Sequence, residues 1–258
     1  MSVTIKSARE IELMREAGKI LAKTHEELAK ALKPGMTTWD IDHLGEEIIR
    51  SYGCIPSFKN YNGYPASICV SVNDEVVHGI PSRKHFIEEG DIVSLDAGVI
   101  YKGYHSDAAR TYGIGEISPE AGRLIEVTKQ SFFEGIKFAK AGNHLNDISS
   151  AIQEYAESFG YGVVRDLVGH GIGTQLHEDP EVPNFSQKRK GILLRPGMTL
   201  AIEPMINAGR ADVVWLDDVW TVETDDGSLS AHYENTVLIT EGEPEILSLL
   251  PAGESHGA

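Results

Sequence analysis

Two amphipathic segments open the chain. In each of them apolar residues recur at intervals of three and four, the spacing that lines one face of an α-helix. The first helix is predicted to begin after the capping residue Ser7 and to end before Pro34. The second helix is predicted from Thr37 or Thr38 to about Tyr52.

Strand-like segments follow these helices. Residues 67–72 have β character, and residues 91–101 and 104–114 predict a β-hairpin closed by the Lys-Gly pair between them. Ser118, followed by a proline at the first helical position, predicts the start of a third helix. The chain is therefore expected to combine helices with antiparallel strands.

The second half of the chain repeats part of the first. One constant shift places Lys33, Gly35, Asp40, Ile41, Ser51 and Gly53 on Lys140, Gly142, Asp147, Ile148, Ser158 and Gly160. The triplet His78-Gly79-Ile80 recurs as His170-Gly171-Ile172. We therefore predict one domain over 1–258, built from duplicated helix-helix-β-hairpin units at about 5–115 and 116–250 around a pseudo-two-fold axis. Residues 251–258 are expected to form a frayed tail.

Composition and charge narrow the class of protein. The 258 residues are 41% hydrophobic and 24% charged, as in ordinary globular proteins. A formal net charge of −16 argues against direct nucleic-acid binding and against an anionic membrane surface. The chain has two cysteines, no signal-peptide pattern and no long apolar stretch, so we expect a cytoplasmic protein.

Acidic residues stand in or beside apolar strand-like segments. They are Asp96, Asp107, Glu203 and Glu234, two from each half of the chain. An unpaired buried carboxylate is costly, and a cluster of carboxylates is tolerated mainly where cations neutralise it. Because a duplicated fold would bring both pairs to one central cleft, the sequence predicts a metal site.

His170 stands between glycines, small residues that let a ligand approach the backbone closely. One neutral imidazole added to four carboxylates suits divalent Mn, Fe(II), Co or Zn. Four carboxylates are more than one ion needs, so two ions that activate a water for hydrolysis are the better interpretation. His78 and His177 are expected to face the substrate, whereas His25 is expected to be structural.

Other chemistries lack their motifs. The glycines around His170 are not followed by a P-loop lysine, which excludes that form of nucleotide binding. No Gly-x-Ser-x-Gly elbow is present, and neither cysteine has the setting of a papain-like nucleophile. A structural ion-pair network is a further alternative, but basic residues are missing near Asp96 and Glu203.

The ligand types occur in a characteristic order: Asp96, Asp107, His170, Glu203 and Glu234. This order resembles the type I methionine aminopeptidases, and the resemblance covers nearly the whole chain. It implies the pita-bread, or creatinase-like, fold, an α+β fold in which helices cover a curved antiparallel sheet. It also implies two divalent metal ions bridged by Asp107 and Glu234, with His170 and Glu203 on one ion and Asp96 on the other.

The same resemblance implies roles for other residues. Glu203 matches the residue that shuttles a proton from the bridging water, and His78 and His177 match two outer histidines that contact the substrate near the scissile bond. The methionine pocket corresponds to Tyr61, Tyr64, Cys69, Leu176 and Trp220. Leu176 and Phe58 stand where some relatives carry Phe and Cys, and both keep the wall apolar. Asn73 and Ser230 match a structural monovalent-cation site.

The implied activity is removal of the N-terminal methionine from nascent proteins and peptides whose second residue is small. The expected partners are these chains, with the ribosome as a further candidate, and the expected oligomeric state is a monomer. Aminopeptidase P and prolidase share the ligands and are the alternative enzymes, although no long N-terminal domain precedes the first helix here. A non-catalytic pita-bread binding module is the other alternative, and the complete ligand set disfavours it. The physiological metal and the effect of Phe58 and Leu176 on selectivity stay open.

Overall fold

The computed structural model describes residues 3–250. Its α-helices are α1 (Ala8–Ala31), α2 (Thr38–Ser51), α3 (Pro119–Ile136) and α4 (Leu145–Ser158). The first three confirm the predicted helices, and their N-caps Ser7, Thr37 and Ser118 each accept a backbone N–H of the first turn. None of the helices within residues 3–250 has the length and apolar character needed to cross a membrane. The tail predicted at 251–258 lies outside the described residues.

The strands of the first half surround the predicted hairpin. They are β1 (Ile55–Pro56), β2 (Ile68–Val72), β3 (Glu75–Val77), β4 (Ile92–Tyr101) and β5 (Tyr104–Gly113), with the 3₁₀ turn η1 (Tyr61–Gly63) between β1 and β2. β4 pairs with β1, β2 and β5, all antiparallel. The predicted strand at 67–72 and the predicted hairpin are therefore confirmed.

The strands of the second half are shorter. They are β6 (Gly162–Val163), β7 (Gly169–Gly171), β8 (Glu178–Val182), β9 (Thr199–Ile202), β10 (Met205–Asn207), β11 (Val213–Trp215), β12 (Val222–Thr224), β13 (Ser230–His232), β14 (Asn235–Leu238) and β15 (Glu245–Ile246). One sheet has the order β15-β14-β9-β7-β8 and another has the order β13-β10-β6. A third sheet, β11-β12-β3, includes one strand of the first half.

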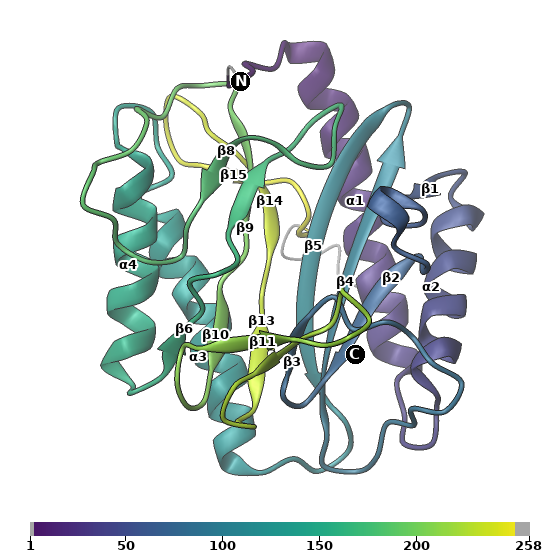
Figure 1. Cartoon of the computed structure of the whole chain (residues 1–258). Coiled ribbons are helices and arrows are strands. Elements are labelled where there is room, and N and C mark those ends of the chain that lie inside the picture. Colours follow the sequence, from purple (N-terminus) through teal and green to yellow (C-terminus); the bar gives the residue numbers. More distant parts are fainter. Residues whose placement is uncertain (1–2, 251–258) are drawn as a thin grey trace.

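The two halves are built alike. Helices α1 and α2 pack against the β4–β5 hairpin, and α3 and α4 pack on the opposite side of the molecule, beside β9 and β14 (Figure 1). In the first half an isolated bridge joins Thr37 to Phe86 just before α2. The shift that superposes the halves carries this bridge onto the one between His144 and Leu193, just before α4. A capping box starts the helix in both cases.

The halves meet where β5 runs beside β13 and β14 (Figure 1). Along this seam, threonine hydroxyls bridge the two backbones. Thr236 Oγ1 accepts from the N–H of Asp107 at 2.8 Å and donates to its carbonyl at 2.9 Å. Thr111 Oγ1 accepts from the N–H of His232 at 2.9 Å and donates to its carbonyl at 3.0 Å. Each half therefore holds the backbone of the other in place at the centre of the molecule.

Candidate active site

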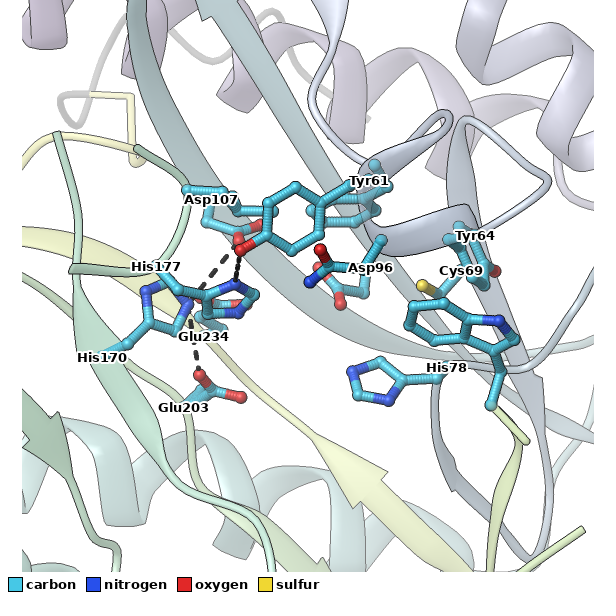
Figure 2. Close-up of a pocket in the computed structure, with 14 residues that line it drawn as sticks. Tyr61, Tyr64, Cys69, His78, Asp96, Asp107, His170, His177, Glu203 and Glu234 are labelled. Carbon is cyan, nitrogen blue, oxygen red and sulfur yellow. Dashed lines mark hydrogen bonds and ion pairs between the residues drawn. The ribbon is translucent and has the colours of Figure 1, made fainter. Parts of the chain in front are cut away.

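A cavity of about 150 Å³ is lined by residues of both halves. Its lining consists of Phe58, Tyr61, Asn62, Tyr64, Cys69, His78, Asp96, Asp107, His170, Leu176, His177, Glu203, Trp220 and Glu234. Every residue predicted for the divalent metal ions, for catalysis or for the methionine pocket is among them. Figure 2 shows Asp107, Glu203 and Glu234 beside His170 and His177, with Tyr64 and Cys69 at the other end of the cavity.

Asp96 and Asp107 come from the β4–β5 hairpin. In its register Asp107 lies opposite Gly98, two residues along the strand from Asp96. Because side chains alternate between the faces of a strand, both carboxylates project from one face as diagonal neighbours. A Cβ on Gly98 would lie 2.7 Å from the Cβ of Ser57, so glycine is needed where the neighbouring segment crosses the hairpin.

Glu203 and Glu234 stand at a break in two paired strands of the second half. The β9–β14 ladder ends just before this break, and the β10–β13 ladder resumes after it in the same register. The two glutamates therefore face each other in the gap, where Pro204 has no N–H to donate. The N–H of Glu234 donates instead across the seam, to the carbonyl of Ala109 at 2.9 Å.

His170 directs one ring nitrogen at the carboxylates. Its Nε2 lies 3.9 Å from Oδ2 of Asp107 and 3.6 Å from Oε1 of Glu203. Its Nδ1 lies 2.9 Å from the carbonyl oxygen of Gly171. Because a carbonyl only accepts hydrogen bonds, Nδ1 carries the proton and Nε2 presents a lone pair to the acids, as a metal ligand does.

The four carboxylates of the cavity would repel one another if all of them were ionised. Burial raises the pKa of Asp96 to about 7. Burial and neighbouring carboxylates raise the pKa values of Asp107, Glu203 and Glu234 well above their ordinary range. Burial lowers the pKa of His170 to about 3, which keeps the imidazole neutral. Positive charge among these groups would favour their ionised forms.

The donor set fits divalent cations. One atom each of Asp107, His170 and Glu234 lie within 4.8 Å of one another. Within residues 3–250, a buried oxygen of each of Asp96, Asp107 and Glu234 has no hydrogen-bond partner. Buried polar atoms normally have a hydrogen-bond partner, so these oxygens indicate the binding site of a ligand. Carboxylate oxygens with one imidazole nitrogen are the donors that borderline divalent metals accept.

The other end of the cavity is aromatic and apolar. The rings of Tyr64 and Trp220 meet edge to face with their centroids 5.2 Å apart, and Tyr64 donates its hydroxyl proton to the carbonyl of Gly79 at 2.9 Å. Cys69 and Leu176 are buried beside them. Burial raises the pKa of the Cys69 thiol well above its usual value, so this side chain packs as a small neutral group.

The two outer histidines differ in their surroundings. His78 has a left-handed backbone, with φ of +59°, and its ring lies 6.2 Å from that of Trp220. The ring of His177 lies 4.2 Å from that of His170, and its Nδ1 lies 2.7 Å from the hydroxyl of Tyr61. Burial lowers the pKa of His78 to about 4 and also lowers the pKa of His177, so both rings are neutral near pH 7.

Three further residues at the site were not predicted from the sequence. Asn62 lines the cavity. Nε2 of the buried His232 lies 3.7 Å from Oε2 of Glu203, and the side-chain amide of Asn184 donates to the carbonyl of Glu203 at 3.0 Å. Asn62 lies next to the predicted Tyr61 in the turn η1. No local motif marks His232 or Asn184, because only the pairing of distant segments brings them to the site.

Comparison with known proteins identifies the family. Residues 12–241 match metallopeptidase family M24. A methionine aminopeptidase of Clostridium acetobutylicum is 59% identical over 247 residues, which cover 96% of this chain and 99% of that protein. The chain belongs to the methionine aminopeptidases of family M24. It is therefore an enzyme, a metallopeptidase, and the carboxylate cluster with His170 is its candidate site for divalent metal.

Solved structures of this family share the fold. A methionine aminopeptidase from Thermotoga maritima superposes with a TM-score of 0.94 at 47% identity, covering 96% of this chain and 100% of that one. The predicted α+β pita-bread fold is thus confirmed. An Xaa-Pro dipeptidase from Bacillus anthracis superposes with a TM-score of 0.75 at 26% identity, but only 62% of that longer chain is covered.

Proposed function

We propose that this chain removes the N-terminal methionine from peptides and nascent chains whose second residue is small. The observation that carries the proposal is that a single cavity has carboxylates and an imidazole at one end and an apolar aromatic wall at the other. A peptide whose first side chain enters the apolar end brings its first peptide bond to the carboxylates. The similarity to methionine aminopeptidases supports the same activity.

The proposed metal ligands are the five residues predicted from the sequence. Asp107 and Glu234 each place a ligand atom within 4.8 Å of one on His170. These two carboxylates are proposed to bridge two divalent ions, which are Mn, Fe(II), Co or Zn. His170 and Glu203 are proposed to hold one ion, and Asp96 the other. Bound divalent ions supply an activated water and positive charge that stabilises the transition state of hydrolysis.

Side chains of the cavity are proposed to complete the chemistry. Glu203 lines the cavity among the other carboxylates and is proposed to take a proton from the attacking water and pass it to the leaving amine. His177 is neutral and is proposed to donate a hydrogen bond to the peptide carbonyl oxygen as negative charge develops there. His78, beside the aromatic wall, is proposed to contact the substrate near the scissile bond.

The apolar end is proposed to bind the methionine side chain. The residues proposed to contact it are Tyr61, Tyr64, Cys69, Leu176 and Trp220, and Phe58 extends the wall. A thioether is apolar and makes favourable contacts with aromatic edges. The cavity volume of about 150 Å³ is below the roughly 300–1,000 Å³ of sites for drug-sized ligands, which suits one side chain.

The test compares tripeptides on one preparation of manganese-loaded protein. Met-Ala-Ser should be cleaved fastest, and Leu-Ala-Ser should follow with a kcat/KM roughly 10- to 200-fold lower, the discrimination that shape alone provides. Lys-Ala-Ser and Met-Lys-Ser should be poor substrates, because the first places a charge in the apolar pocket and the second has a large second residue. Equal rates on all four peptides would rule out the proposed pocket.

A second candidate is an Xaa-Pro-specific peptidase of the same fold, as the Bacillus anthracis structure suggests. Cleavage of Ala-Pro-Ser faster than Met-Ala-Ser would favour it. The aromatic pair of Tyr64 and Trp220 in the cavity favours methionine instead.

Other properties stay predictions. The N–H of Ser230 donates to the carbonyl of Asn73 at 2.8 Å, so the two residues proposed to hold a monovalent cation lie side by side. Ribosome association and a monomeric state also stay predictions, and a cytoplasmic location is expected from the two cysteines and from the sequence patterns described above. None of them is needed for the proposed reaction.

A further inference from the structure

Tyr61 is more than part of the pocket wall. Its hydroxyl lies 2.7 Å from Nδ1 of His177, and the two rings are tilted against each other with centroids 5.2 Å apart. The residue comes from the turn η1 of the first half, whereas His177 immediately precedes β8 of the second half. One hydrogen bond thus joins the two halves at the cavity.

A neutral imidazole has one nitrogen that donates and one that accepts, and the partner of one nitrogen decides the state of the other. His170 shows this rule within the same cavity. Its Nδ1 donates to the carbonyl of Gly171, which leaves Nε2 unprotonated toward the carboxylates. The state of His177 depends in the same way on which partner supplies the proton in its bond to Tyr61.

The surroundings of the Tyr61 oxygen favour the phenol as the donor. Burial raises the pKa of Tyr61, so the phenol keeps its proton near neutral pH. Among residues 3–250, Nδ1 of His177 is the hydrogen-bond partner of this hydroxyl, so no other acceptor in the described part of the chain competes for the phenol proton. A phenol hydroxyl is a good donor and the unprotonated nitrogen of a neutral imidazole is a good acceptor, so the proton of this hydrogen bond comes from the phenol.

We propose that the hydroxyl of Tyr61 donates to Nδ1 of His177 and thereby places the imidazole proton on Nε2, where it is available to the substrate carbonyl. Tyr61 is then a positioning residue that acts through His177. Two neighbouring rings, 4.2 Å apart, are fixed in opposite tautomers: His170 offers a lone pair and His177 offers a proton. This inference rests on the role proposed for His177 in peptide cleavage.

The kinetic test is a double-mutant cycle on manganese-loaded protein with Met-Ala-Ser. Tyr61→Phe keeps the ring and removes only the hydroxyl, so kcat should fall roughly 10- to 100-fold, as for other lost orienting hydrogen bonds, while KM changes little. In a His177→Ala background the same substitution should change kcat by less than about two-fold, because its partner is already gone. An unchanged kcat in Tyr61→Phe, or effects that multiply in the double variant, would overturn the inference.

The tautomers are read directly by nitrogen NMR of zinc-loaded protein labelled at histidine. The wild type should carry the proton of His177 on Nε2 and that of His170 on Nδ1, and Tyr61→Phe should alter only His177. A proton on Nδ1 of His177 in the wild type would overturn the inference, whatever the kinetics.

A matched control and the His177→Ala variant separate the possible failures. Tyr112→Phe also removes a hydroxyl, one that contacts the carbonyl of His25 at 3.4 Å outside the cavity, and it should leave kcat and both tautomers unchanged. A wild-type kcat in His177→Ala would overturn the role proposed for His177 itself. A lowered kcat in His177→Ala with an independent effect of Tyr61→Phe would overturn only the inference drawn here.

Discussion

The two halves carry the same His-Gly-Ile triplet and use it differently. His170 lies in the extended strand β7 and directs Nε2 at the carboxylates. His78 follows β3 with φ of +59° and lies against Trp220 at the apolar end. In both copies the glycine is required by a close backbone contact, because a Cβ on Gly79 or Gly171 would lie 2.4 or 2.2 Å from a carbonyl oxygen. The glycine keeps its close backbone contact in both copies, and the local backbone decides which histidine lies among the carboxylates.

The acidic pairs differ in a similar way. The first half presents Asp96 and Asp107 from the middle of a continuous hairpin, whereas the second half presents Glu203 and Glu234 from a break between ladders. The paired strands of the hairpin hold the backbone of Asp96 and Asp107 in fixed positions, so their short side chains project in defined directions. At the break the glutamates are one methylene longer and are held by bonds to their backbone carbonyls and N–H groups, as Asn184 holds the carbonyl of Glu203.

The largest expected effect separates the two triplets. His170→Ala removes a proposed metal ligand, so metal content should fall and kcat/KM should drop more than the roughly 10- to 100-fold that supporting residues cost. His78→Ala should keep its metal and lose turnover. Metal analysis and steady-state kinetics on the same preparations check this pair. Depleted metal in His78→Ala, or full metal in His170→Ala, would show that the comparison between the triplets is wrong.

The next largest expected effect is a pH dependence of stability, caused by the four carboxylates that the two halves bring into one cavity. The folded-state pKa of Asp96 is raised from 3.8 to about 7 by burial, and those of Asp107, Glu203 and Glu234 are raised well above their ordinary values by burial and by neighbouring carboxylates. Such groups stabilise the fold while they are protonated, so their contribution is complete below about pH 4 and is lost as the pH rises through 7. Metal-stripped protein should therefore lose thermal stability between pH 5 and pH 8, and added manganese should restore it at pH 8.

Thermal unfolding at both pH values, with and without manganese, makes this measurement. The ion pair of Glu46 and Lys59 should not add to this pH dependence. The hydrogen bond from Lys59 lowers the pKa of Glu46 to about 2, so the pair contributes the same stability at pH 5 and at pH 8. Equal stability of the stripped protein at the two pH values would show that the carboxylates do not repel one another as described.

The smallest effect concerns backbone strain. The first half places asparagines in left-handed conformations, at Asn60, Asn62 and Asn73, which this residue tolerates. The second half has Val219 at φ of +65°, a conformation that is strained for a β-branched side chain, and its side chain is 75% exposed. Val219→Gly should stabilise the protein by about 1 kcal/mol, or roughly 2–4 °C in Tm.

Val214→Gly is the matched control for this substitution. Val214 is also exposed but lies in the strand β11, where glycine adds only flexibility to the unfolded chain, so Tm should fall. A lower Tm in Val219→Gly, measured by the same thermal unfolding, would show that the left-handed residue is not strained.

Much of the scaffold could be predicted from local patterns. The cap at Ser7 and the apolar spacing of helix α1 are local signals that predict it. The structural role expected for His25 agrees with its burial and with its hydrogen bond to the carbonyl of Ala108 at 2.8 Å. Asp96 could be identified as a candidate site residue because an unpaired carboxylate buried in an apolar strand is energetically costly. These signals lie within a few residues of the position they describe.

The contacts that tune the site could not be predicted in this way. His232 reaches Glu203 only because β13 pairs with β10, and Tyr61 reaches His177 only because the fold brings η1 close to the start of β8. The role of Thr236 at the seam depends likewise on β14 lying beside β5. Such contacts join residues far apart in sequence, and no periodicity or motif encodes them.

The most direct test of the central claim follows turnover of Met-Ala-Ser while manganese is added back to metal-stripped protein. The stripped wild type should be inactive, and activity should rise in proportion to bound metal. Asp107→Asn, which removes one proposed bridging carboxylate, should bind less metal and stay more than roughly 100-fold less active throughout. Full turnover by the stripped protein, or wild-type turnover by Asp107→Asn at limiting metal, would contradict the assignment of the carboxylate cluster as the catalytic metal site.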